Sequence, residues 1–573
     1  MKNKLKERKG ITLIALVITI IVLLILAGVS IAMLTGENGI LNQANKAKTE
    51  TGYKGAEEKV KLSAIGAKTI NNGGEITQKN LETELGKYFT SGKYNVTPET
   101  NEDGTEGYIV TITEKDQNGR KYFVSNNGNV TEYIEKEQGK PEGAGGTNFN
   151  MSVGAIEVEF LEGTGYNIGK ANEPLLDEKA MIPIKYNGTN WVATTKDDVD
   201  WYNYDTENRK WANVMLSDGT YTLETVPKNQ PLEESELGSM FVWIPRYAYK
   251  IVYFDNQSDK ESYIENGRTD TSNVVGYSDA RGVVDKEGNV RADITKNITG
   301  IKVGDNYRPH PVFENNVEQG GWDEKLTGIW VGKFETTSKT SSNETNMILP
   351  NKSILMCRNV STYFNKAKDI GIKLAMTLDS HMMKNTEWGA ATYLTESKYG
   401  RNGTPVSVNQ CINYRTGLGR GEGDNQISNS NYSFRELIEE QRYNGNIGML
   451  SSTTENIYGI YDMAGGSWEY VMGIYGTDKP SLGNTGFTEE DFPERKYYNL
   501  YTTKDNTNIG DALYETSGWN SNSTGFVNSS DSAFRRGGES RSYVGGIFSF
   551  QSPYVYGGEA PNNYSFRVCL AVQ

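Results

Sequence analysis

The sequence predicts an α+β protein in which an N-terminal transmembrane helix precedes a small α+β headpiece and a larger β-rich α+β domain. Three observations lead to this expectation. Residues 11–34 form an apolar run without a charged side chain, residues 35–136 combine helical and strand-like segments, and the remainder holds short strands among Gly, Asn and Ser loops. A chain of 573 residues is expected to form several domains.

Net charge, cysteine spacing and tyrosine content limit the kinds of ligand and partner that the chain is expected to bind. The net charge is −14, and no long Lys/Arg run lies beyond the N-terminus, so nucleic acid is not an expected partner. The three cysteines, Cys357, Cys411 and Cys569, show no CxxC spacing, which argues against a zinc ribbon or a disulfide framework. Tyr outnumbers Phe by 35 to 17, and Tyr is a residue type suited to contact surfaces.

The first element is the apolar run at 11–34. A helix of about 24 residues is roughly 36 Å long, which is enough to cross a bilayer. The preceding residues 1–10 (MKNKLKERKG) are basic and are expected to stay cytoplasmic, which sends everything after residue 34 outward. The run is too long for a secretory signal peptide, so cleavage before the helix is the better interpretation.

The residues around Gly10 carry a family resemblance. Residues 9–14 (KGITLI) resemble the type IV prepilin signature. This resemblance implies that a prepilin peptidase cuts after Gly10, that Ile11 becomes the N-methylated N-terminus, and that other pilin subunits are partners. Ala15 stands where that family usually has Glu, which weakens the inference to a conventional filament. An ordinary single-span anchor is the alternative.

Residues 35–136 are expected to form a pilin-like stalk helix and a small β-meander. Residues 41–64 have helix-forming composition. One apolar face of a short second helix would be lined by Leu81, Leu85, Tyr88 and Phe89. Asn-Gly turns separate the strand-like runs that follow, at 107–113, 120–124 and 129–134. An arbitrary α+β spacer is the alternative interpretation.

The rest of the chain divides into a linker and two regions. Residues 137–150 contain Pro, several Gly and charge but little to bury, as is typical of a flexible linker. Residues 151–239 are expected to be a β-rich accessory region with packing rather than chemistry. The main domain is expected at 240–573.

Three motifs in order give the main domain its resemblance: residues 456–469 (NIYGIYDMAGGSWE), 536–538 (RGG) and 566–568 (FRV). Together they resemble the formylglycine-generating-enzyme, or sulfatase-modifying-factor, family. The resemblance covers residues 240–573 and implies a compact variant of the C-type lectin fold.

The resemblance does not extend to that family's oxidase chemistry. Those enzymes bind copper through two cysteines between the RGG and FR motifs, whereas no cysteine lies between Arg536 and Arg567. We therefore expect no copper and no enzyme activity. The histidines are His310 and His381, without a metalloprotease, P-loop or nucleophile-elbow motif, and His381 is interpreted as a packed or surface residue. A carboxylate pair assembled by folding is left open.

The same family resemblance implies a structural calcium site. Its ligands would be the side chains of Asp462 and Glu469 and the main-chain carbonyls of Gly465 and Ser467. Hard oxygen ligands from one tight loop suit calcium. The alternative is that these carboxylates cap the turn.

The segment between Arg536 and Arg567 is also similar to the variable region of proteins diversified by retroelements. Tyr, Ser and Asn are residue types that form adaptable recognition surfaces. An ordinary Tyr/Ser-rich loop is the alternative. The candidate ligand-binding residues are Ser540, Ser542, Tyr543, Ser549, Gln551, Ser552, Tyr554, Tyr556, Asn562, Asn563 and Tyr564.

These expectations combine into one hypothesis. The chain would be a cell-surface, pilin-like receptor or adhesin, anchored in the membrane or in a pilus, whose extracellular C-terminal domain binds an external protein or glycan. A structural minor pilin without a dedicated ligand is the first alternative, and a surface enzyme with an unrecognised carboxylate site is the second.

Overall fold

The computed structural model describes most of the chain after residue 55. The expected processing site at Gly10 and Ile11, the membrane helix at 11–34 and the linker at 137–150 lie outside the described residues. Among the helices of the described part, none has both the length and the apolar character required to cross a bilayer. The described residues are 56, 58–71, 74–100, 106–113, 120–128, 130–133, 151–162, 167–168, 171–279, 282–285, 290–292, 307–338, 346–411, 414–419, 439–477, 479–502, 509–540, 545–552 and 563–571.

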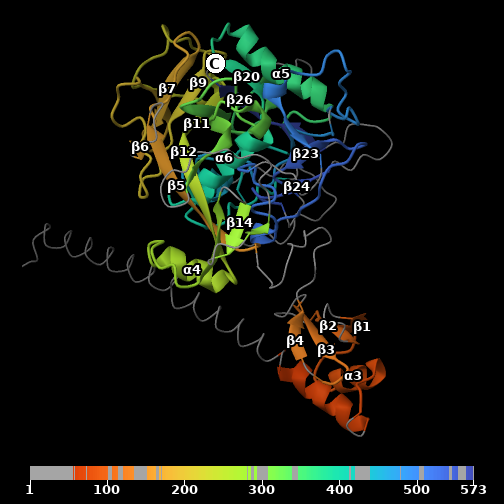
Figure 1. Cartoon of the computed structure of the whole chain (residues 1–573). Helices are drawn as coiled ribbons and strands as arrows, with labels where there is room; N and C mark the ends of the chain where they lie inside the picture. Colours follow the sequence, from red (N-terminus) through yellow and green to blue (C-terminus); the bar gives the residue numbers. More distant parts are fainter. Residues whose placement is uncertain are drawn as a thin grey trace, which may run out of the picture. The chain divides into compact units, whose positions relative to one another are not determined.

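The chain divides into two compact units, residues 1–138 and 139–573. Both combine helices with sheets whose strand pairs are mostly antiparallel, so the expected mixture of helices and sheets is present (Figure 1).

In the first unit, a helix at 58–70 and α3 (Gln78–Leu85) pack with a four-stranded antiparallel sheet in the order β1-β2-β3-β4. The Thr77 side chain caps α3 by accepting a hydrogen bond from the Asn80 backbone N–H. The predicted second helix and meander are confirmed, and β1 is an additional edge strand. The strands are β1 (Tyr94–Thr100), β2 (Glu106–Ile112), β3 (Arg120–Ser125) and β4 (Val130–Tyr133).

The largest sheet of the second unit has eight strands. Every residue of three of its central strands is buried, so both faces of the sheet are covered there. In spatial order the strands are β10 (Pro231–Leu232), β8 (Trp191–Ala193), β7 (Met181–Tyr186), β9 (Asn213–Leu216), β11 (Met240–Pro245), β17 (Gly328–Gly332), β26 (Val568–Ala571) and β20 (Asp379–Met382).

A second sheet follows directly in the chain, since only Arg246 separates β11 from β12. Its strands, in spatial order, are β15 (Val290–Ala292), β14 (Gly282–Asp285), β13 (Val274–Asp279), β12 (Tyr247–Phe254), β5 (Gly154–Glu162) and β6 (Asn167–Ile168), with β16 (Arg308–Pro309) pairing β12.

A third sheet contains the C-terminal motifs. Its order is β22-β21-β23-β24, and β25 pairs in parallel with the start of β21. The strands are β21 (Trp468–Tyr475), β22 (Asn499–Tyr501), β23 (Ala533–Arg536), β24 (Phe550–Gln551) and β25 (Tyr564–Phe566), and a two-stranded ribbon is formed by β18 (Thr337–Ser338) and β19 (Asn346–Met347).

The expected boundary between residues 239 and 240 falls inside these sheets. Strand β9 hydrogen-bonds to β11, and β5 runs antiparallel to β12 along seven residue pairs. One hydrophobic core runs from Ile156 to Ala571. Residues 151–239 are therefore built into the same unit as the strands that follow them.

Helix α6 (Asn385–Glu396) lies in the interior of this unit, where it contacts β5, β11 and β21 (Figure 1). All 12 of its residues are buried. Helix α5 (Val360–Lys373) instead covers β20 with one apolar face, and the Asn359 side chain caps it through the Thr362 N–H. A further helix, α4 (Gln257–Glu265), packs near β12.

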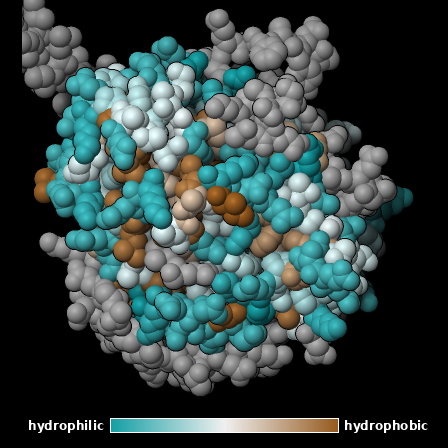
Figure 2. Space-filling model, turned by 90° about the horizontal axis from the view of Figure 1, so that it is seen from above, coloured by the Kyte–Doolittle hydropathy of each residue, from teal (hydrophilic) through white to brown (hydrophobic). Residues whose placement is uncertain are grey.

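One surface of the molecule is shown in space-filling form in Figure 2. Hydrophilic residues cover most of this view, and hydrophobic residues appear in small separate groups. Scattered apolar side chains of this kind are ordinary on a surface that faces water.

Candidate functional site

The third sheet brings together part of the predicted recognition segment. Tyr564 pairs with Trp468, Arg535 pairs with Tyr470, and Gln551 pairs with Arg535. Residues directly opposite one another on paired strands point to the same side of a sheet. We call this side, formed by Trp468, Tyr470, Arg535, Gln551 and Tyr564, the Arg535 face.

Arg535 is half-buried at the centre of this face. Its guanidinium carbon lies 4.3 Å from the ring centre of Trp468 and 5.0 Å from that of Tyr564. Nη2 donates a 2.6 Å hydrogen bond to Gln551 Oε1, and Nη1 donates to the Tyr564 hydroxyl. Burial lowers the pKa of Arg535, while the neighbouring Tyr564 opposes that shift. The guanidinium is thus oriented by two side chains and stacked on aromatic rings.

Arg536, the next residue in strand β23, points to the opposite side of the third sheet. Arg536 is buried, and its guanidinium donates to the Asn385 side chain and to the carbonyls of Asp511 and Ala512. Because side chains alternate along β23, the Arg536 side chain lies inside the core and the Arg535 side chain lies on the Arg535 face.

Six of the predicted recognition residues lie in the described part of the chain. Ser540, Ser549 and Tyr564 are buried, and Tyr564 contributes to the Arg535 face through its contacts with Arg535. Gln551, Ser552 and Asn563 are half-buried. The remaining predicted residues, Ser542, Tyr543, Tyr554, Tyr556 and Asn562, lie outside the described residues.

A polar contact joins the two ends of the recognition segment. The Asn563 side-chain amide donates to the Glu539 carboxylate, which also lies 3.4 Å from the Tyr414 hydroxyl. The Asn563 carbonyl accepts hydrogen bonds from Trp468 N and Ser467 Oγ. The described positions Glu539 and Asn563, near the two ends of the recognition segment, are therefore held by hydrogen bonds close to the third sheet.

The turn predicted to bind calcium is held by the protein's own donors. Asp462 has a φ of 64°, and its carboxylate accepts hydrogen bonds from Asn409 Nδ2 at 2.8 Å and from Gly417 N at 2.9 Å. Gly465 and Gly466 also have positive φ, at 80° and 69°, a conformation that glycine adopts without strain. The turn is thus fixed by hydrogen bonds and glycine backbone geometry.

The second predicted carboxylate ligand is paired with an arginine. Arg567 donates from Nε to Glu469 Oε2 at 2.9 Å and from Nη2 to Glu469 Oε1 at 2.5 Å. A third buried carboxylate, Glu335, accepts from Ser467 N through Oε1, and its Oε2 has no hydrogen-bond partner. Burial, together with the nearby Glu469 and Asp462, raises the pKa of Glu335. Burial also raises the pKa of Asp462 to about 6, although Arg567 opposes the shift.

This arrangement does not fit a calcium ion well. Both Glu469 oxygens accept hydrogen bonds from Arg567, whose positive charge would repel a divalent cation at the same position. Because the pKa of Glu335 is raised, this carboxyl group takes up a proton more readily than an exposed one, which reduces the buried negative charge. Calcium stays a prediction that this geometry does not favour.

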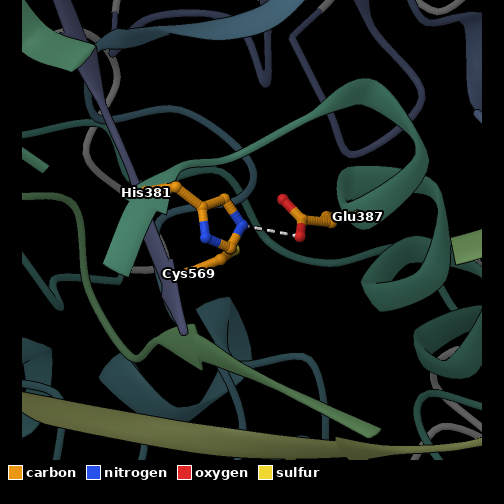
Figure 3. A group of neighbouring side chains, drawn as sticks. All are labelled: His381, Glu387 and Cys569. Atoms are coloured by element: carbon orange, nitrogen blue, oxygen red, sulfur yellow. Dashed lines mark hydrogen bonds and ion pairs between the residues drawn. The ribbon is translucent and has the colours of Figure 1, made fainter. Parts of the chain in front are cut away.

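A different group of potential metal ligands is formed by His381, Glu387 and Cys569, which lie on β20, α6 and β26 (Figure 3). All three are buried, and their ligand atoms lie within 4.8 Å of one another. His381 Nε2 lies 2.8 Å from Glu387 Oε1, and the sequence-based interpretation of a packed His381 is confirmed. A neutral His381 imidazole could bind a metal ion, whereas a protonated one could not, so its protonation state decides between the two.

The geometry favours a protonated His381. Its Nδ1 lies 3.2 Å from Asp379 Oδ1, so carboxylates face both ring nitrogens. Although burial alone would lower it, Glu387 and Asp379 raise the pKa of His381 to about 9. An imidazolium has no free lone pair for a metal, and burial raises the pKa of the Cys569 thiol well above its ordinary value. We interpret this group as a buried ion-pair cluster that joins β20 to α6.

Sequence reasoning overlooked Arg535, Glu335 and Glu539. For Arg535 a pattern was available, because the strand-like run 533–536 (AFRR) alternates, and one of its two arginines must face away from Phe534. Glu335 and Glu539 carry no local motif, since their roles depend on partners distant in sequence.

Neither the protein-family models nor the curated protein sequences compared with this chain match it.

Proposed function

We propose that the chain is a cell-surface binding protein whose second unit recognises an external ligand through the Arg535 face and the adjoining segments 541–544 and 553–562. The observation that carries this proposal is the strand register. It gathers Arg535, Gln551 and Tyr564 on one side of a sheet, next to the anchored ends of the Tyr- and Ser-rich segments. A rigid sheet that carries adaptable segments is a common design for recognition.

The proposed mechanism is non-covalent binding. The sheet fixes Arg535 and Gln551 through their mutual hydrogen bond, so little side-chain freedom is lost when a ligand binds there. The buried carboxylates Glu335, Asp462 and Glu469 are fully enclosed, so a substrate would not reach them without opening the fold. This favours a binding protein over a surface enzyme that uses those carboxylates.

The proposal includes the resemblances of the N-terminus to type IV prepilins and of the main domain to the formylglycine-generating-enzyme family. The prepilin-like N-terminus would deliver the chain to the cell surface, and the second unit would be a lectin-like scaffold of the formylglycine-generating-enzyme type. Diversification of the recognition segment by a retroelement belongs to the same proposal. A structural minor pilin without a ligand is the alternative to be tested.

The test is a binding screen of the full chain against arrays of proteins and glycans. A variant with Tyr543, Tyr554 and Tyr556 replaced by Ala is expected to lose at least tenfold in affinity for any ligand found. Tyr88→Ala is the matched control, because Tyr88 is an exposed tyrosine in the first unit. Unchanged binding by the triple variant would remove those tyrosines from the site, and a chain that binds nothing would favour the structural alternative.

A further inference from the structure

Arg535 is a cation whose hydrogen bonds reach no carboxylate of the described residues, although the negative charge of nearby Glu539 opposes the lowering of its pKa by burial. Within the described part of the chain it forms no ion pair with a carboxylate, and its hydrogen bonds go to the neutral groups of Gln551 and Tyr564. Lys185 and Lys260 of the same unit pair with the carboxylates of Asp198 and Glu396. The buried cations Arg536 and Lys333, in contrast, donate to neutral oxygens inside the fold. Arg535 differs from these two in being only half-buried, and a partly desolvated guanidinium without a directly paired carboxylate is stabilised when a ligand supplies one.

The guanidinium also retains unused hydrogen-bonding capacity. It carries five N–H groups, and two of them are used by Gln551 Oε1 and the Tyr564 hydroxyl. Its Nε is buried and has no hydrogen-bond partner, so the capacity left for a ligand lies on Nη1 and Nη2. Because the planar fork of a guanidinium matches the two oxygens of a carboxylate, an acidic group is the complementary ligand chemistry.

We propose that Arg535 anchors a side-chain carboxylate of an acidic protein segment at the Arg535 face, an inference that rests on the proposed binding function and names its ligand class. The hydrogen bonds to Gln551 and Tyr564 hold the guanidinium in place before the ligand arrives. The half-buried side chain of Gln551 adds an amide group beside the anchor, which suits a polypeptide ligand.

The exposure of the aromatic rings favours a protein ligand over a sugar. Sugars stack on the open faces of aromatic rings, but Trp468 is 5% exposed and Tyr564 is 2% exposed. The Arg535 guanidinium already covers the Trp468 ring. Among the described residues of this face, recognition therefore depends on charge and hydrogen bonds rather than on ring stacking.

The experiment measures binding of the purified full chain to an array of random peptides. Each acidic peptide is paired with a counterpart in which Asp and Glu are replaced by Asn and Gln, and a parallel array carries sugars with and without a carboxylate. The variants are Arg535→Lys, which keeps the charge without the fork, and Arg535→Gln, which removes the charge. Arg442→Gln is the matched control because Arg442 is exposed and lies outside this face. Thermal unfolding of each variant shows whether the fold is retained.

The proposal expects acidic peptides to bind at least tenfold more tightly than their amide counterparts. Arg535→Gln should abolish that preference, Arg535→Lys should reduce it, and Arg442→Gln should leave it unchanged. Peptide binding that is insensitive both to acidic groups and to Arg535→Gln overturns the carboxylate anchor and leaves the proposed binding function standing. Binding confined to acidic sugars overturns the choice of a protein ligand. If the folded chain binds neither array, the proposed function itself fails.

Discussion

Arg567 and Glu469 form a two-bond ion pair in which neither side chain is exposed to solvent. Glu469 lies at the start of β21, and Arg567 directly precedes β26. Arg567 also donates to the carbonyl of Gly332 in β17 and to that of Tyr461. It thereby ties the third sheet to the eight-stranded sheet. Removal of either partner would leave the other as a buried, unpaired charge.

We therefore predict that Arg567→Met and Glu469→Gln each destabilise the second unit by about 3–5 kcal/mol, as is usual when a buried pair is broken. Denaturant unfolding followed by tryptophan fluorescence measures the loss. The double variant should lose less than the sum of the two, because it leaves no unpaired charge. Asp369→Asn is the control, since its ion pair with Lys373 is exposed on both sides, and little change is expected. Single variants as stable as the parent chain would contradict this account.

The same pair gives a prediction for calcium. Because Arg567 occupies both Glu469 oxygens, the unfolding temperature is expected to be the same in excess calcium and in excess chelator. Differential scanning calorimetry of the full chain provides the comparison. A rise of several degrees in calcium that disappears in Glu469→Gln would show that Glu469 exchanges Arg567 for the metal, and would restore the ligand set implied by the family resemblance.

Local patterns predicted much of the first unit. The apolar spacing of Leu81 and Leu85 and the Asn-Gly turns sufficed for α3 and the meander. Strand β1 was overlooked because Pro98 interrupts its sequence. Proline is tolerated there because β1 is an edge strand, and edge position is a tertiary property that the sequence does not display.

The second unit shows the opposite limit. The sequence motifs begin near residue 240 and predict a domain boundary there, but β9 pairs with β11 and β5 pairs with β12 across that position. Pairings between such separated segments are not encoded in local composition. The same reason explains why the residue types at 540–564 indicated a recognition segment but did not distinguish buried Ser549 and Tyr564 from half-buried Gln551.

The buried His381 predicts a pH-dependent contribution to stability. Its pKa is about 9 in the folded chain, above the ordinary value of 6.5, because Glu387 and Asp379 stabilise the charged form against the cost of burial. A group whose pKa rises on folding stabilises the fold fully below its unfolded pKa, and the contribution is lost as the pH rises through the folded pKa. For His381 the loss occurs between about pH 6.5 and 9 and amounts to roughly 3 kcal/mol.

The measurement must separate His381 from Lys384, which lies nearby and titrates in an overlapping range. Burial lowers the pKa of Lys384 to about 8, so its contribution changes with the opposite sign and increases above pH 8. The readout is therefore the stability difference between the parent chain and His381→Gln, measured from pH 6 to 10. This difference should shrink as the pH rises.

His310 supplies the matched control for that experiment. Burial lowers the pKa of His310 to about 3, so it is neutral throughout pH 6 to 10. Unfolded His310 titrates near 6.5, so the stability difference between the parent chain and His310→Asn should rise slightly from pH 6 to about 7.5 and stay constant from about pH 8 to 10, unlike that of His381. A difference for His381→Gln that does not shrink between about pH 7.5 and 9 would mean that His381 is neutral in the fold, which would return the group with Glu387 and Cys569 to consideration as a metal site.

The close approach of α6 to residue 510 gives the last prediction. Replacing a glycine within a helix by alanine normally stabilises the helix by up to about 1 kcal/mol. At Gly389, however, a Cβ atom would lie 1.9 Å from the backbone oxygen of Gly510. A backbone atom cannot move aside as a flexible side chain does, and both segments are buried. Overpacking should therefore outweigh the gain in helix propensity.

We expect Gly389→Ala to destabilise the second unit by about 2 kcal/mol or more, since overpacked cores typically lose 1–3 kcal/mol. Thermal unfolding of the full chain measures the effect. Gly188→Ala is the control, because its φ of 98° is strained for alanine while no atom lies within 4 Å of the added Cβ. The control should lose only about 1–2 kcal/mol from backbone strain. A stabilised Gly389→Ala variant would show that α6 and residue 510 are farther apart than the structure places them.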